Sequence, residues 1–241
     1  MGFIYFNIQF PNAGTKFPAI TSMNFLAHTE ISPYEPSPRH FFGCIFPDLA
    51  RRAGVAFRKK QFEDSFHAMP EDFRLGVALH FEADRQFHNS ALFLSGMQMW
   101  KEILKPGAPD LKRSFFLHHL VFEMWLDRLI MKEDTQAGMR FYEMLGQLDT
   151  RALHSELALL FGADADRLMD VFQQFMTRKF VLAYKDPAQF SEISAGVFAY
   201  ITGQKQGLLQ PSEVEAALEL AIPYESKARE EWRSFKSALR L

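Results

Sequence analysis

The regular helical spacing of apolar residues is the feature that most constrains the fold of this chain. Residues 109–132 show it clearly, because Leu117, Leu120 and Met124 recur at intervals of three and four positions. Few segments alternate apolar and polar side chains as half-buried strands do, and no segment repeats at a fixed period. The pattern therefore predicts an all-α fold in which separate helices pack together.

Proline, glycine and short polar runs mark the ends of the predicted helices. The clearest breaks are KPGAPD at 105–110 and TGQKQG at 202–207. Pro70 is followed by two acidic residues, which is typical of a helix start. Residues 90–100 either extend the helix that follows Pro70 or start another one. We expect the other helices at 41–53, 70–89, 109–132, 135–147, 150–161, 164–183, 189–201 and 211–239.

The length of the chain suits one compact domain with a large core. It has 241 residues, of which 48% are hydrophobic and 26 are Phe, so we expect a core rich in aromatic contacts. Residues 1–22 contain two prolines and no helical periodicity. We expect them to form an extended N-terminal segment, or to lie upstream of a natural start at Met23. Residues 23–241 are then a single-domain bundle of many helices.

Charge and composition argue against some classes of partner. The formal net charge is −2 and the pI is about 6.5, so no basic footprint for nucleic acid is expected. The sequence contains no run of 18 or more apolar residues, so no membrane span is predicted. Cys44 is the single cysteine, so an intramolecular disulfide is impossible, and a reducing compartment, the cytoplasm, is the simplest expectation.

The segment LHFEADRQFH, residues 79–88, carries groups that bind metal ions. His80, Asp84 and His88 stand four residues apart. Positions four apart on a helix differ by about 40° around the axis and about 6 Å along it, so His80 and Asp84 can converge on one ion or one phosphate. His88 is about 12 Å from His80 along the axis. It could serve a second ion or the substrate.

The helix expected at 109–132 repeats this spacing. His119, Glu123 and Asp127 are also four apart, and His118 stands beside His119. Imidazole and carboxylate together suit Mn, Fe or Zn, whereas carboxylate with water suits Mg. The alternative is structural: the histidines are hydrogen-bonded packing residues, and the two acids pair with Arg128 or Lys132.

Several short segments resemble the acyl carrier protein phosphodiesterase family and occur in the order found there. They are MNFLAH (23–28), GCIFPDLAR (43–51), GVALHFEAD (76–84), HHLVFEMW (118–125) and YKD (184–186). The resemblance covers roughly Met23 to the C-terminus. It implies an HD-domain-like helical fold, related to HD-type metal phosphohydrolases. It also implies removal of the 4′-phosphopantetheine arm from holo acyl carrier protein with a divalent metal, Mn or Mg.

The resemblance also implies a set of site residues. The metal ligands would be His28, Asp48, His80, Asp84, His118 and His119. His88 and Glu123 would transfer protons or orient a ligand, and the substrate would meet Arg51, Arg52, Tyr184 and Asp186. For Tyr184 and Asp186, a simple turn between two helices explains the sequence equally well.

The chain departs from the family pattern at three carboxylate positions, which here are Ser114, His118 and His88. Replacing carboxylate by imidazole shifts the preference from Mg toward Mn, Fe or Zn. An acidic acyl carrier protein would need a basic surface, for which Arg51, Arg52 and residues 58–60 are candidates, although 58–60 also read as a solvated loop.

These observations predict a metal-dependent phosphodiester hydrolase acting on holo acyl carrier protein. Two alternatives stay open. One is an HD-type phosphohydrolase of a nucleotide or another small phosphoester. The other is a helical binding protein without catalytic activity, in which the polar cluster is only structural.

Overall fold

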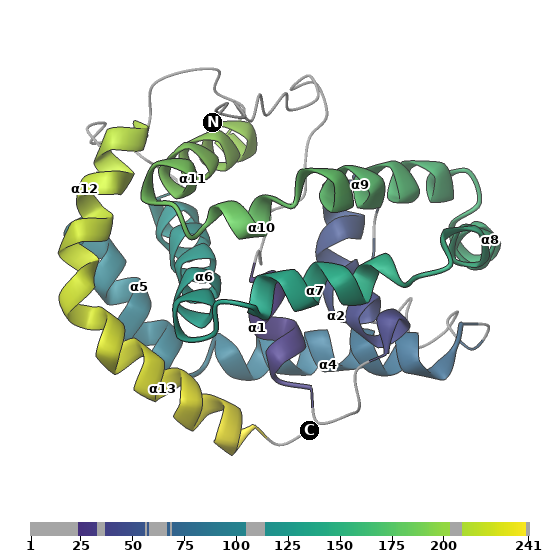
Figure 1. Ribbon diagram of the computed structural model, residues 1–241, viewed down its shortest axis with the longest axis horizontal. Coiled ribbons are helices and arrows are strands. Elements are labelled where there is room, and N and C mark those ends of the chain that lie inside the picture. The colour runs from purple at the N-terminus through teal and green to yellow at the C-terminus, as the bar shows by residue number, and fades with distance from the viewer. Residues whose placement is uncertain are drawn as a thin grey trace.

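A computed structural model describes residues 24–32, 37–55, 57, 67, 69–104, 114–202 and 209–239. Every element of regular secondary structure in these ranges is a helix, which confirms the all-α prediction (Figure 1). The predictions made for residues 1–22 and 58–60 lie outside this part of the chain. The helices are α1 (Phe25–Glu30), α2 (Pro38–Arg52), α4 (Glu71–Phe87), α5 (Ala91–Ile103), α6 (Ser114–Glu133), α7 (Ala137–Gly146), α8 (Thr150–Phe161), α9 (Asp164–Arg178), α10 (Phe180–Ala183), α11 (Pro187–Thr202), α12 (Pro211–Ala221), the 3-10 turn η2 (Ile222–Tyr224) and α13 (Glu225–Ala238).

Local capping explains where the helices near the site begin. The Ser37 side chain accepts a hydrogen bond from the His40 N–H, and Pro38 occupies the first turn, so α2 starts three residues before the predicted position. The Ser90 side chain accepts from the Phe93 N–H in the same way. Residues 90–100 therefore start a new helix, α5, instead of extending α4.

Two helices predicted as continuous are interrupted in the structure. The predicted helix 164–183 breaks at Lys179, which has a φ of 46° and ends α9 in the left-handed conformation. The predicted helix 211–239 breaks at the 3-10 turn η2, which contains Pro223. Proline has no N–H for the helical ladder, so the chain changes direction between α12 and α13.

Helices α2 and α4 pack with their backbones in contact. A Cβ atom added at Gly76 would lie 2.2 Å from the His40 carbonyl oxygen, and one at Gly43 would lie 2.3 Å from the Phe73 carbonyl oxygen. Any residue larger than glycine at either position would push the two helices apart. This close approach determines how residues of α2 lie opposite residues of α4.

Aromatic side chains fill the core, as their number in the sequence predicts. Phe42 packs against Phe46, Phe73 and Phe172, with ring centroids 5.0–5.7 Å apart. Helix α1 packs against α2, α4, α6 and α7, and thus lies inside the bundle (Figure 1). None of the described helices is long and apolar enough to cross a membrane.

Candidate metal centre

Three helices bring together His28, Asp48 and His80. They come from α1, α2 and α4 respectively, and all three side chains are buried. Each offers one ligand atom, and these atoms lie within 4.8 Å of one another. The rings of His28 and His80 have centroids 4.2 Å apart. The set contains two imidazoles and one carboxylate, which is a donor set suited to Mn, Fe or Zn.

The hydrogen bonding of His80 prepares it as a ligand. Its Nδ1 lies 2.8 Å from the Cys44 carbonyl oxygen and donates a hydrogen bond to it. The lone pair is then on Nε2, as in most metal-binding histidines. Burial lowers the pKa of His80 to about 4 and lowers the pKa of His28 well below its usual value. Both rings are therefore neutral near pH 7, the form that binds a cation.

Arg51 pairs with the carboxylate of this group. Its Nη1 donates to Oδ1 of Asp48 at 2.8 Å. Asp48 is buried, whereas the Arg51 side chain keeps 23% of its surface exposed. Arg51 therefore contacts both the buried Asp48 and the solvent, so it lies at the edge of the site. Arg52 points elsewhere, with its guanidinium carbon 6.0 Å from the Phe180 ring centroid.

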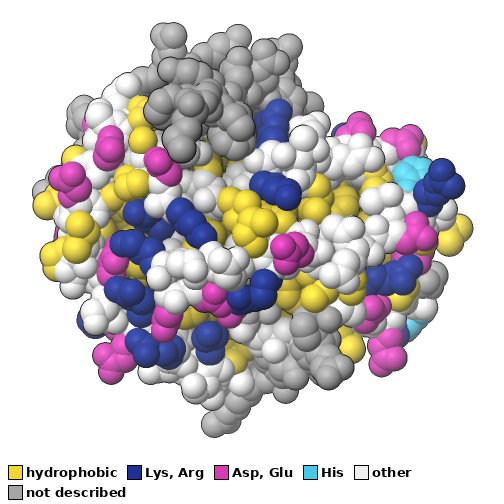
Figure 2. All heavy atoms as spheres, in the orientation of Figure 1, with side chains coloured by type: hydrophobic (Ala, Val, Ile, Leu, Met, Phe, Trp, Pro, Cys, Tyr) yellow, Lys and Arg dark blue, Asp and Glu magenta, His cyan; other side chains and the backbone are white. Residues whose placement is uncertain are grey.

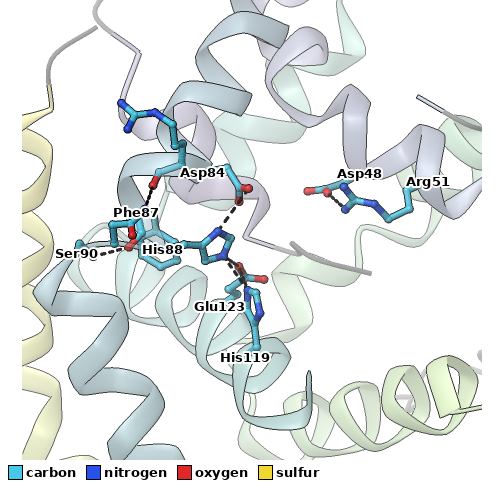
Figure 3. A network of polar contacts seen from close by, with 10 residues as sticks. Asp48, Arg51, Asp84, Phe87, His88, Ser90, His119 and Glu123 are labelled. Atoms are coloured by element: carbon cyan, nitrogen blue, oxygen red, sulfur yellow. Dashed lines mark hydrogen bonds and ion pairs between the residues drawn. The ribbon is translucent and has the colours of Figure 1, made fainter. Parts of the chain in front are cut away.

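A second group consists of His88, His119 and Glu123, from the C-terminus of α4 and from α6 (Figure 3). His119 Nε2 lies 2.7 Å from Glu123 Oε1, and the Nε2 atoms of His88 and His119 are 2.9 Å apart. His88 Nε2 is 3.4 Å from the same Glu123 oxygen. Both imidazoles thus face one buried carboxylate oxygen.

Asp84 lies between the two groups. Its Oδ2 is 3.5 Å from His88 Nδ1, and Oδ1 is buried with no hydrogen-bond partner among the described residues. Figure 3 shows the Asp84 carboxylate between His88 and the carboxylate of Asp48. Burial would raise the pKa of Asp84, but the interactions with His88 outweigh it and lower that pKa. Burial would likewise lower the pKa of His88, but Asp84 and Glu123 raise it to about 10.

Asp127 positions α1, a role that the sequence analysis missed. Its carboxylate accepts hydrogen bonds from the backbone N–H groups of Leu26 (3.1 Å) and Ala27 (3.0 Å). These donors belong to the first turn of α1, which carries His28. The spacing of Asp127 after His119 and Glu123 marked it as facing the same side of α6. The backbone partner could not be found from spacing.

The structural alternative for the acids of α6 is wrong in its choice of partners. Arg128 donates to the carbonyl oxygens of Tyr184 and Lys185, and Lys132 binds Glu225 at 2.6 Å. Glu123 contacts His119 instead. Glu123 therefore faces the site and Asp127 holds α1, whereas Arg128 connects α6 to the turn after α10 and Lys132 connects it to α13.

Three more predicted site residues lie elsewhere, besides Arg52. His118 donates from Nε2 to the Leu104 carbonyl oxygen at 3.1 Å, because neighbouring helical positions point about 100° apart and His119 takes the direction of the site. Tyr184 is fully buried, and its hydroxyl has no hydrogen-bond partner among the described residues. Asp186 accepts from the Gln189 N–H at 3.0 Å and so caps the first turn of α11. For Tyr184 and Asp186, the turn interpretation fits this geometry.

The site is the main guide to function. Comparison of the chain with protein-family models, with curated proteins and with solved structures finds no match. The resemblance to acyl carrier protein phosphodiesterases therefore stays a prediction.

A cavity of about 240 Å³ lies apart from both groups of ligands, between α5, α6 and the C-terminal segment η2–α13. Phe122, Trp125 and Ala228 are among the residues that line it, and none of its lining residues belongs to either group. Its position does not connect it to the chemistry of the candidate ligands.

Proposed function

We propose that this chain is a metal-dependent phosphodiester hydrolase. The observation that carries the proposal is the convergence of His28, Asp48 and His80 from three helices, with the His80 Nδ1 held by a backbone carbonyl. A ligand set of this composition fits a divalent cation of the Mn, Fe or Zn type.

Such a cation lowers the pKa of bound water and neutralises charge that develops on a phosphoryl group. Arg51 supports the choice of a phosphoryl substrate. Its guanidinium is partly exposed and stands next to Asp48, so it can bind a phosphate oxygen at the edge of the site. His88 lies between Asp84 and Glu123 and contacts both. His88 and Glu123 would act either in proton transfer or as ligands themselves.

Holo acyl carrier protein is the first substrate to test. The sequence resemblance supports it, and an acidic partner would be attracted by basic residues near Asp48 such as Arg51. Another basic surface lies on the face that carries α6, α7 and α13, where Figure 2 shows Lys and Arg mixed with acidic side chains. There Lys132 and Arg229 contact Glu225, and Arg233 contacts Glu133, so these charges are largely compensated within the protein.

The test is hydrolysis by the purified chain, supplied with Mn, Fe, Zn or Mg. Release of 4′-phosphopantetheine from holo acyl carrier protein is measured beside a panel of simple phosphodiesters and nucleotides. We expect turnover that is lost in His80→Ala and Asp48→Asn. His154→Ala is the matched control, because His154 also binds a carboxylate, Asp166, at 2.8 Å but lies on the surface. Full activity in His80→Ala, or no hydrolysis of any substrate with any metal, would contradict the proposal.

A further inference from the structure

The group formed by His88, His119 and Glu123 has the dimensions of a cation site. The three donor atoms form a triangle with sides of 2.7, 2.9 and 3.4 Å. For metal–ligand bonds of about 2.1 Å, neighbouring ligand atoms are about 3.0 Å apart in octahedral and about 3.4 Å apart in tetrahedral geometry. The three donor atoms would therefore have to move by only a few tenths of an ångström to bind an ion.

The chemistry of the group also favours an ion. Glu123 has a side chain that is only 1% exposed, so its negative charge needs positive charge nearby, which either a protonated His88 or a bound cation can supply. The facing Nε2 atoms of His88 and His119 cannot both direct lone pairs at each other without a proton or a cation between them. A divalent ion would satisfy the carboxylate and both nitrogens at once.

The surrounding residues hold the two rings in this orientation. Phe93 packs edge-on against both, with centroid distances of 4.6 Å to His88 and 5.0 Å to His119. Asp84 Oδ2 lies on the Nδ1 side of His88, so the other nitrogen of that ring faces the group. A carboxylate behind a histidine is a common arrangement around metal ligands.

We propose that His88, His119 and Glu123 bind a second divalent cation, and that Asp84 positions the His88 ring for this site. This proposal rests on the proposed function, because it places the second ion beside the first site. Asp84 suits this role because its Oδ2 faces Nδ1 of His88, on the side of the ring opposite Nε2. Its charge also acts on His28 and His80, so Asp84 couples the second group electrostatically to the first.

The second site assigns a role to the imidazole of His88, which stands where the resembling family has a carboxylate. Two imidazoles and one carboxylate select Mn, Fe or Zn over Mg, because Mg prefers oxygen ligands and water. In a phosphodiester hydrolase, a pair of cations stabilises both the attacking and the leaving oxygen. His88 and Glu123 then act as ligands instead of proton-transfer groups.

Metal content tests the proposal directly. The full chain is stripped with a chelator, loaded with Mn or Zn, dialysed and analysed for metal per chain. We expect two equivalents in the wild type and in the His154→Ala control, and one in His119→Ala and in Glu123→Gln. His80→Ala should also bind only one equivalent of metal, because this variant loses the first site. Glu123→Gln keeps the shape of the side chain, so it stays informative where His119→Ala fails to fold.

Titration of the stripped protein with Mn tests the role of Asp84. We expect Asp84→Asn to bind the second ion about 10–100-fold more weakly than the wild type, because the His88 ring loses the carboxylate that orients it. One equivalent in the wild type, lost in His80→Ala and kept in His119→Ala, would overturn the second site and leave the proposed function intact. No bound metal in the wild type would overturn both. Equal affinity for the second ion in Asp84→Asn and in the wild type would overturn the role of Asp84.

Discussion

At the scale of single residues, the histidines differ in what their second nitrogen contacts and in what surrounds them. His80 donates from Nδ1 to the Cys44 carbonyl and belongs to the converging group with His28 and Asp48. His118 also donates to a backbone carbonyl, that of Leu104, but it is not among the converging ligands. Backbone contacts of this kind orient a ring, and the neighbouring side chains then determine whether the ring can bind a metal.

The lowered pKa of His80 predicts how the stability of the metal-free protein depends on pH. The folded value is about 4, and an unfolded histidine has a pKa of about 6.5. Between these values the unfolded chain binds a proton at His80 that the folded chain does not bind. Stability should therefore fall as the pH drops from about 6.5 to about 4, by roughly 3 kcal/mol for this residue.

Urea denaturation in the presence of a chelator, at several pH values, measures this dependence. His80→Asn should show a shallower slope than the wild type over the same window. His28 should leave a remaining slope of the same sign, because burial also lowers its pKa. Identical slopes for His80→Asn and the wild type would show that His80 is not neutral in the folded protein.

At the scale of helices, the site depends on two elements that do not hold their position by themselves. Helix α1 has only six residues, which is too short to be stable alone. It is fixed by Asp127 and by packing of Phe25 against Phe175 and Phe180, with centroids 4.9 and 5.7 Å apart. The pair α2–α4 is fixed by the glycine contact described above.

Removing the Asp127 carboxylate should release α1. In Asp127→Ala, the N–H groups of Leu26 and Ala27 lose their acceptor inside the protein, at a cost of at least about 2 kcal/mol. His28 then loses its fixed position, so metal affinity at the first site should also fall. Urea denaturation and metal titration measure the two effects. Asp127→Asn retains an oxygen acceptor and should lose less of both, whereas equal losses in the two variants would contradict the capping role.

The contact between α2 and α4 predicts a large effect for a small substitution. Gly76→Ala would place a methyl group 2.2 Å from the His40 carbonyl oxygen, so the helices must separate, at a cost of about 2–3 kcal/mol. The separation would also move His80 relative to Asp48 and weaken metal binding. Gly146→Ala is the control, because an added Cβ there meets no atom within 4 Å and alanine favours helix. Thermal melting of the two variants should change in opposite directions.

At the scale of the whole molecule, the proposed ligands connect helices that are distant in the sequence. The first group joins α1, α2 and α4, and the second joins α4 to α6. Bound cations would therefore link four helices of the bundle. The apolar core would remain the main source of stability, because aromatic and aliphatic side chains fill the space between these helices.

Metal binding should raise the thermal stability of the complete chain. A ligand that binds only the folded state at 100 times its Kd adds about 2.7 kcal/mol, which for a chain of this size corresponds to about 5–10 °C in Tm. Differential scanning fluorimetry with Mn or Zn, before and after chelation, measures the shift. The shift should be smaller in His80→Ala and unchanged in His154→Ala. An equal shift in His80→Ala would mean that the metal binds elsewhere.

The sequence by itself determined the all-α class, most helix positions, and the shared face of His80, Asp84 and His88. These properties depend on local periodicity and capping, which are readable within a few turns of one helix. The tertiary structure alone decided that His28, Asp48 and His80 converge, that Asp127 holds α1, and that His118 turns away from His119 toward Leu104. The physical reason is that convergence depends on how separate helices pack, through contacts such as Gly43 against Gly76, and the spacing within one helix contains no information on that packing.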